Sequence, residues 1–155
     1  MSIQSRIMHF VAGVMFEHPV RGISADALLD RFRASQLPFT AALQHKSDTE
    51  ANRTHVAHII GIERWAQARL DQVHSGVPHQ AESNAYVPTT DVSYVQLVTL
   101  ADTTRTASIA LLNSVVTANL PLTQHIMHTG FGSMSVAGWI QYMMSHSMLE
   151  AKKLR

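Results

Sequence analysis

The chain has 155 residues, a hydrophobic content of 46%, a formal net charge of +1 and no cysteine. This size suits one domain with a sizeable core, so we expect a single domain over residues 1–155. The small net charge and the lack of a Lys/Arg stripe interleaved with aromatics argue against nucleic acid as a partner. Without cysteine there are no disulfides, zinc–thiolate sites or cysteine nucleophiles, and we expect a cytoplasmic protein. No apolar run approaches the roughly 18 residues of a membrane span, so we expect no membrane partner.

A short helix is expected at the N-terminus. Arg6 precedes a short apolar run, but His9 interrupts it and no small-residue cleavage site follows, which argues against a signal peptide. A helix that ends before His18-Pro19 is predicted instead. This apolar segment is also a candidate contact between copies of the chain. The apolar residues that recur at helical spacing are Ile3, Ile7, Phe10, Val11 and Val14.

Three long helices are expected in the middle of the chain. The first covers about residues 24–45 and contains Pro38, which predicts a kink or a local break because proline removes a backbone hydrogen bond. The second covers about residues 47–74 and opens on a Ser-x-x-Glu spacing typical of a capping box. A long loop over residues 75–90 has turn residues and no period. The third helix covers about residues 91–118.

A fourth long helix is expected from Met134 to Arg155, with Ser133 or Ser135 as its N-cap. It follows a loop over residues 119–132 that carries two histidines. No alternating stretch bounded by hairpin turns stands out, so no strands are expected. Four long amphipathic helices with two long connections predict an all-α protein: an antiparallel four-helix bundle with a short extra N-terminal helix.

Two polar side chains of the last helix conflict with its apolar pattern. At about 100° per residue, His146 and Glu150 fall on the same side of the helix as Val136 and Met143. Ionisable groups on a buried face must be paired, hydrogen-bonded or bound to a metal. A separation of four residues places their Cβ atoms about 6 Å apart, close enough to hold one cation. The pair therefore predicts either ligands for a divalent metal or an ordinary His–Glu contact near a helix end.

Neighbouring helices carry further candidates. In the helix over residues 47–74, His55 lies nearer the centre of the apolar stripe and His58 lies at its edge, so helical phase slightly favours His55 as a third ligand. In the next helix, Asp102 and Arg105 are three residues apart, which indicates a helix-surface ion pair. His125 falls in the following loop, together with His128, and nothing in the sequence fixes the position of either.

Two stretches resemble the DinB/YfiT-like superfamily. His58-Ile59-Ile60-Gly61-Ile62-Glu63-Arg64-Trp65 is similar to that family's second-helix signature, in which a metal-ligating histidine precedes a small apolar run, an acidic residue and an aromatic residue. The stretch 130–150 resembles the last helix of the family, which typically carries two histidines at H-x-x-x-H spacing. The resemblance covers about residues 24–155. It implies a four-helix bundle, often a homodimer, with a divalent metal in the bundle mouth.

The resemblance selects His58 over His55 and also selects His146. The sequence departs from the family at Glu150, which stands where the second histidine would be. Since a carboxylate also ligates metals, the expected site is His58, His146 and Glu150 with Zn or Ni, although the same change is what a lost site would leave. Family members include thiol-dependent S-transferases, which implies a metal-dependent transferase or hydrolase that acts on a small-molecule substrate with a low-molecular-weight thiol.

Two alternatives do not involve a metal. One is a small-molecule-binding module whose mouth is lined by Trp65, Trp139 and Tyr142. The other is a structural dimeric bundle with no site. A metal centre, a metal-free pocket and a purely structural role therefore remain open at the level of the sequence.

Overall fold

The computed structural model describes residues 3–155, with side chains from Arg6 onward, so the side chain of Ile3 lies outside the described part. The protein is mostly helical, as the sequence predicts. The expectation that strands are absent is wrong, because β1 (His125–His128) and β2 (Gly132–Ser135) pair as an antiparallel hairpin. Each strand has four residues, which is too short for an alternating pattern to stand out in the sequence. No helix within residues 3–155 is long and apolar enough to cross a membrane.

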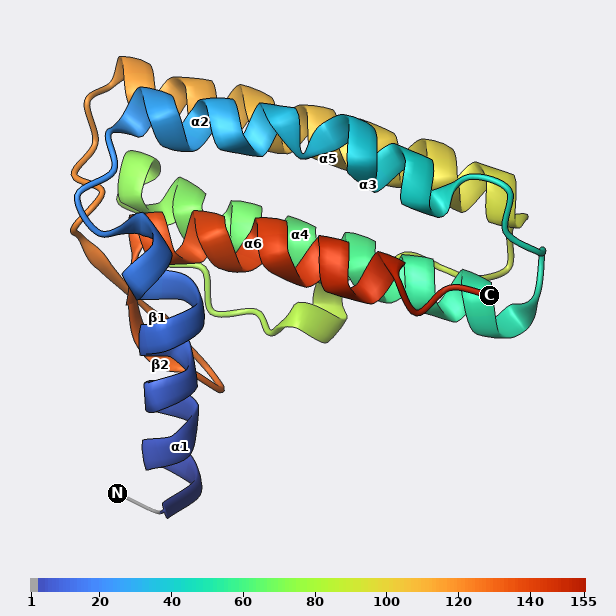
Figure 1. Ribbon diagram of the computed structural model, residues 1–155, viewed down its shortest axis with the longest axis horizontal. Helices are drawn as coiled ribbons and strands as arrows, with labels where there is room; N and C mark the ends of the chain where they lie inside the picture. Colours follow the sequence, from blue (N-terminus) through green and yellow to red (C-terminus); the bar gives the residue numbers. More distant parts are fainter. Residues whose placement is uncertain (1–2) are drawn as a thin grey trace.

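Five helices form the body of the molecule. They are α2 (Ala25–Ala34), α3 (Gln36–Leu43), α4 (Glu50–Ser75), α5 (Tyr94–Thr117) and α6 (Val136–Ala151). Figure 1 shows α2 and α3 following one another beside α5, with α6 beside α4. It also shows that α4 and α5 run in the same direction, opposite to α2, α3 and α6. The predicted fully antiparallel order is therefore wrong for α4 and α5, because the long connection between them carries the chain back along the molecule and includes the short 3-10 helix η3 (Ser83–Tyr86).

The predicted first long helix is divided into α2 and α3. The break falls at Ser35, which is both the C-cap of α2 and the N-cap of α3. Pro38 therefore lies in the first turn of α3, where its missing N–H removes no helical hydrogen bond. The proline predicted the break correctly, but the break is three residues earlier than the proline itself.

Side-chain caps set the starts of the other long helices. Thr49 caps α4 by accepting a hydrogen bond from the Asn52 backbone, so the predicted cap at Ser47 is wrong by two residues. Ser93 caps α5 in a complete capping box. Ser135, one of the two predicted candidates, caps α6, which ends at Ala151 rather than at Arg155.

Buried apolar side chains form two clusters along the long helices, and buried polar side chains lie between them. On α4, Glu63 falls between Ile60 of one cluster and Ala66 of the other. On α6, Ser147 falls between Met143 and Ala151 in the same way. The buried polar side chains of this layer are Glu63, Arg105, Ser108 and Ser147.

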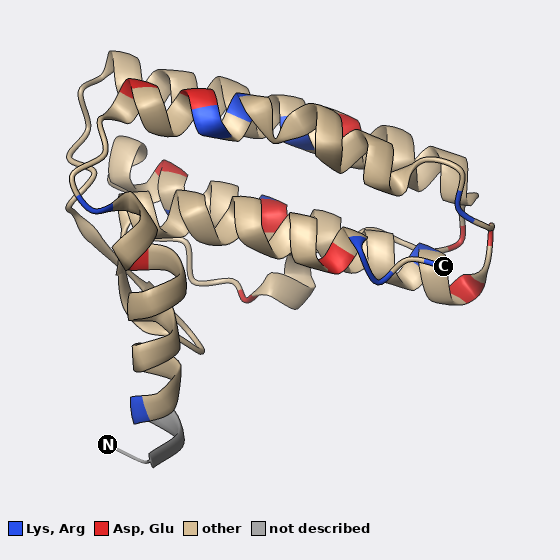
Figure 2. Cartoon of the chain, in the orientation of Figure 1, with Lys and Arg blue, Asp and Glu red and all other residues tan. Residues whose placement is uncertain are grey.

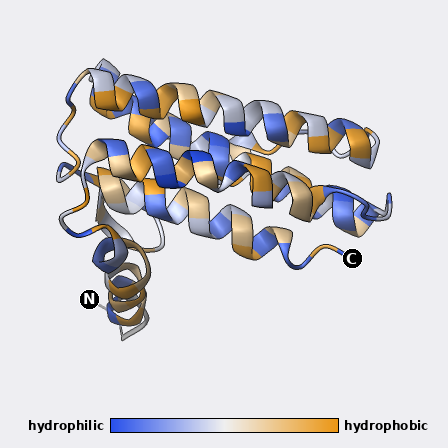
Figure 3. Ribbon diagram, turned by 45° about the horizontal axis from the view of Figure 1, so that its top comes forward, coloured by the Kyte–Doolittle hydropathy of each residue, from blue (hydrophilic) through white to orange (hydrophobic). Residues whose placement is uncertain are grey.

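The N-terminal segment leaves the body of the molecule. After α1 (Ile3–Ala12), the chain passes through a π-helical turn (Gly13–Glu17) and a 3-10 turn (His18–Val20). Figures 1 and 3 show α1 projecting away from the other helices, with apolar residues along it. Phe10 is 73% exposed, and Ile7 and Val14 are also exposed. The carboxylate of Glu17 holds the segment to the start of α6, because it accepts hydrogen bonds from the backbone nitrogen and the hydroxyl of Ser135, both at 2.7 Å.

Candidate functional site

Helices α4 and α6 bring together two of the predicted ligands. The ring centres of His58 and His146 lie 5.2 Å apart, edge to face. Two imidazoles on one tetrahedral ion would have ring centres roughly 5 Å apart, given metal–nitrogen bonds of about 2.0–2.1 Å. Ordinary aromatic pairs span the same distance. The spacing therefore fits a shared ion, although it does not require one.

Glu150 lies close to the same histidines, but its carboxylate is turned toward His55. His55 Nε2 lies 2.9 Å from Glu150 Oε2 and 3.1 Å from the Glu150 carbonyl oxygen. Lys153 Nζ donates to the other carboxylate oxygen, Oε1, at 2.6 Å. The ring centres of His55 and His58 are 6.5 Å apart. Three histidines and one carboxylate thus lie in one region, with both carboxylate oxygens already occupied.

With the side chains placed in this way, residues 3–155 contain no group of three or more His, Asp or Glu side chains arranged to hold a metal ion. The physical reason is visible around Glu150, since its two oxygens face His55 and Lys153. A metal bound at His58 and His146 would have to draw this carboxylate away from one of those partners.

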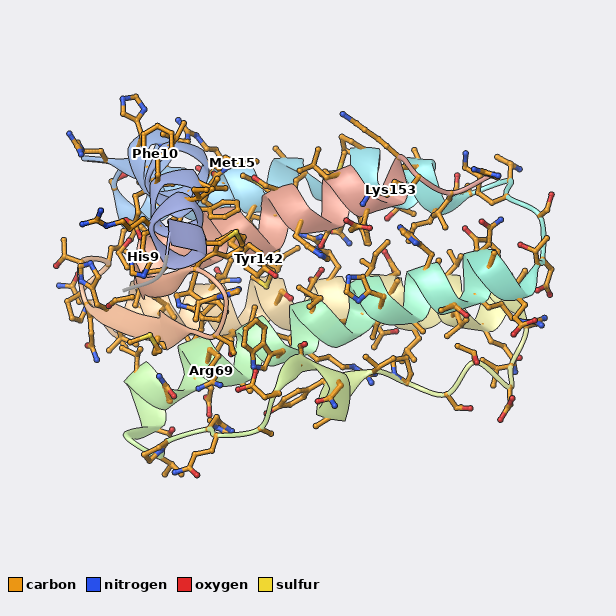
Figure 4. All side chains as sticks on the ribbon, turned by 90° about the horizontal axis from the view of Figure 1, so that it is seen from below. His9, Phe10, Met15, Arg69, Tyr142 and Lys153 are labelled. Atoms are coloured by element: carbon orange, nitrogen blue, oxygen red, sulfur yellow. The ribbon has the colours of Figure 1, made fainter. Side chains whose placement is uncertain are left out.

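An open hollow of about 770 Å³ gives access to this region from solvent. Figure 4 looks onto the side chains between α6 and α4, with Tyr142 on α6 and Lys153 just beyond its C-terminal end. His58 is exposed at the rim, whereas His146 is partly buried behind it. The residues that line the hollow are Glu50, Ala51, Thr54, His55, His58, Glu150 and Lys153.

The electrostatic surroundings favour the forms of these side chains that bind metals. Burial lowers the pKa of His146 to about 4, with a further decrease from His58 and an opposing effect of Glu150. Desolvation also lowers the pKa of His58, against the opposing charge of Glu150. For Glu150, burial acts to raise the pKa, but the Lys153 hydrogen bond and the nearby His146 lower it below its ordinary value. Neutral imidazoles and an ionised carboxylate at neutral pH are what metal ligation needs.

One ring nitrogen of the His58–His146 pair has no hydrogen-bond partner. His146 Nδ1 is buried and makes no hydrogen bond. A buried polar atom without a partner is costly, and native proteins satisfy nearly all such atoms. This buried nitrogen beside His58, without a hydrogen-bond partner, is the observation that best fits a metal-ligating role for His146.

The aromatic residues predicted to line a mouth belong to the core instead. Trp65, Trp139 and Tyr142 are all buried, and their rings contact one another and the ring of His128 at centre distances between 4.9 and 5.9 Å. That prediction is therefore wrong. The rings close the inner side of the site rather than opening it to a ligand.

His128, which the sequence left unplaced, sits at the end of β1 inside this aromatic cluster. Its Nδ1 accepts hydrogen bonds from the backbone N–H groups of Gly130 at 3.0 Å and Phe131 at 3.1 Å. Burial lowers its pKa to about 4, so the ring is neutral at pH 7. By contrast, His125 at the start of β1 is exposed.

The predicted surface pair of Asp102 and Arg105 is wrong. Arg105 is fully buried and pairs with Glu63 of α4, with Nη2 3.0 Å from Oε2. Its guanidinium stacks between the rings of Phe32 and Phe39, 4.5 Å from each. From the sequence, Glu63 stood only as the acidic residue of the stretch 58–65, and its buried pairing was not predicted. It falls on the apolar stripe of its helix, and that signal could have indicated its burial.

The DinB/YfiT-like resemblance is carried by two short stretches, residues 58–65 and 130–150. In the structure residues 58–65 lie on α4, and the part of the second stretch from Val136 onward lies on the neighbouring α6, so that the two helices supply the two adjacent imidazoles. No model of a protein family, no curated protein and no solved structure matches the chain.

Proposed function

We propose that the chain is a DinB/YfiT-like four-helix bundle, formed by α2–α3, α4, α5 and α6, that binds one divalent metal ion, Zn or Ni. The proposed ligands are His58, His146 and Glu150. The observation that carries the proposal is the meeting of His58 and His146, which are far apart in the sequence, with His146 Nδ1 buried and unpaired.

The side chains around the site have suitable chemistry for their proposed roles. His58 and His146 are held in their neutral forms, and Glu150 is an ionised carboxylate. His55 already contacts Glu150, so we assign it as the outer partner that orients this carboxylate, a role that metal sites commonly require. Three protein ligands leave coordination positions open for a substrate, which is the layout of catalytic sites.

When bound, such an ion would act as a Lewis acid and lower the pKa of a coordinated water or thiol. The residues of the chain give a small molecule access to the site and keep water away from its inner side. The open hollow admits a small molecule beside His58, and the Lys153 side chain, 61% exposed, places a positive charge at its rim. The buried ring of Tyr142, whose centre lies 5.6 Å from that of the His146 ring, keeps water out behind His146. We therefore propose a metal-dependent transferase or hydrolase that acts on a small molecule, with a low-molecular-weight thiol as the favoured co-substrate.

Metal titration of chelator-treated protein without an affinity tag tests this proposal. We expect one Zn²⁺ or Ni²⁺ per chain, no binding by His58→Ala, and binding weakened by about tenfold in His55→Ala, as for other outer partners of ligands. Glu150→His should retain binding, since imidazole is also a good ligand. His74→Ala is the matched control, because His74 is an exposed histidine of the same helix. No binding by the wild type, or loss with His55→Ala but not with His58→Ala, would refute the assignment.

A further inference from the structure

The buried carboxylate of Glu63 joins three helices. Its Oε1 accepts a hydrogen bond from Ser108 Oγ of α5 at 2.6 Å, and its Oε2 accepts one from Ser147 Oγ of α6 at 3.1 Å. Arg105 Nη2 of α5 lies 3.0 Å from Oε2. Glu63 is 2% exposed, and the partner side chains are at least as deeply buried. This carboxylate is therefore the central group of the polar layer that separates the two apolar clusters.

The hydroxyl of Ser147 has two possible acceptors, the Met143 carbonyl at 2.9 Å and Glu63 Oε2 at 3.1 Å. A hydroxyl has one proton, and a carboxylate is the stronger acceptor. Burial raises the pKa of Glu63, while Arg105 and the two serine hydroxyls oppose that rise. Donors on both oxygens fit an ionised carboxylate, so we assign the Ser147 proton to Glu63.

This contact lies directly beside the candidate site. Ser147 follows His146 in the sequence, and Glu150 is less than one helical turn further on. A shift of α6 by one residue would move each side chain by about 1.5 Å along the axis and 100° around it. Such a shift would separate Ser147 from Glu63 and His146 from His58 together.

Next to this layer the apolar contacts of α6 come from methionines, whereas the buried Trp139 lies about two turns earlier in the helix. Met143 and Met148 pack on the two sides of the layer, and methionine side chains adapt easily to altered surroundings. The hydrogen bond from Ser147 to Glu63 cannot adapt in this way, because a shifted α6 would leave both polar groups buried and unpaired. Polar groups in an apolar interface are known to fix helix register in this way.

We propose that Glu63 is a positioning residue: by accepting the hydrogen bond of Ser147, it fixes the rotation and axial position of α6 and thereby holds His146 opposite His58. The part of the test that measures metal binding rests on the proposed function. The proximity of the two rings can be measured without metal, so the two ideas can fail separately.

Ser147→Ala and Ser108→Ala form a matched pair for the test. Each change removes one buried hydroxyl that donates to the same carboxylate, and each serine also lies near the carbonyl four residues earlier in its helix. Only Ser147 belongs to α6. We measure Co²⁺ affinity and the Co²⁺ absorption spectrum, and in metal-free protein the NMR cross-relaxation between the His58 and His146 rings. Ser147→Ala should weaken Co²⁺ binding by about tenfold, change the spectrum and lose the cross-peak. Ser108→Ala should retain all three.

Each result separates the two proposals. If Ser147→Ala retains the cross-peak, or if Ser108→Ala loses it equally, the positioning role is overturned. If the wild type binds no Co²⁺ but the two variants differ in the cross-peak, the proposed function fails and the positioning role stands. If the wild type binds Co²⁺ and Ser147→Ala matches it in every readout, the proposed function survives and Glu63 has no positioning role.

Discussion

Replacing Arg105 by methionine tests the energetics of the buried layer. The change removes the positive charge and retains an unbranched side chain between Phe32 and Phe39. It leaves the carboxylate of Glu63 buried without its counter-charge. Because burial already raises the pKa of Glu63, we expect this carboxyl to take up a proton in the folded variant.

The expected loss in the free energy of unfolding follows from the cost of keeping Glu63 protonated. The ordinary pKa of this carboxyl is 4.5. Keeping it protonated at pH 7 therefore costs about 3 kcal/mol, at about 1.4 kcal/mol per pH unit. In the variant the folded state binds more protons than the unfolded state between pH 4.5 and pH 7, so its stability falls as the pH rises. Because burial already raises this pKa in the wild type, we expect Arg105→Met to lose up to about 3 kcal/mol relative to the wild type at pH 7, and progressively less toward pH 5.

Urea unfolding of both proteins at pH 5, 6 and 7 measures this difference. The double variant Glu63→Gln with Arg105→Met contains no buried charge at this position, so it should recover most of the lost stability. A loss below about 1 kcal/mol, a loss that does not change with pH, or a double variant as unstable as the sum of the two single changes would refute this reasoning.

Three further predictions concern other parts of the molecule. His128 has a pKa of about 4 when folded against an ordinary value of 6.5, so its titration alone should cost the wild type up to about 3 kcal/mol between pH 6.5 and pH 4, in addition to the contribution of His146, and unfolding of His128→Phe should depend less on pH in that range. A Cβ atom at Gly61 would lie 2.5 Å from Val87 Cγ2, so Gly61→Ala should cost about 1–3 kcal/mol in thermal unfolding, whereas Gly13→Ala, with nothing within 4 Å, should not. We expect a homodimer that buries the apolar side of α1, so light scattering should show the wild type as a dimer and Phe10→Glu as a monomer; a monomeric wild type contradicts this.

The surface charges give little guidance to a macromolecular partner. On the face drawn in Figure 2, acidic and basic residues are scattered, without a stripe of one sign. The charges that the proposals use are those of Glu150, Lys153 and Glu63, which act over contact distances.

The sequence predicted the long helices and the orientation of His146 well, because both follow from the helical period. Val136 and Met143 are buried as the pattern requires, and His146 is partly buried on the same side. The hairpin was missed since four-residue strands give no clear alternation. The parallel course of α4 and α5 was missed because a long loop does not reveal where it leads.

Contacts between helices were harder to predict than the helices themselves. Helical phase describes one helix at a time. It slightly favoured His55 over His58, whereas the structure places His55 against Glu150 and His58 against His146. The same limitation hid the pairing of Glu63 with Arg105. Each lies on the apolar stripe of its own helix, but only the packing of α4 against α5 shows that the two stripes face each other.

The most direct test of the metal site follows the histidine ring nitrogens by NMR while Zn²⁺ is added to uniformly ¹⁵N-labelled protein. We expect one ring nitrogen of His58 and one of His146 to shift together, saturating at one ion per chain, while the rings of His74 and His125 stay unchanged. Unchanged spectra for His58 and His146, or shifts only in other histidines such as His74 and His125, would refute the metal site.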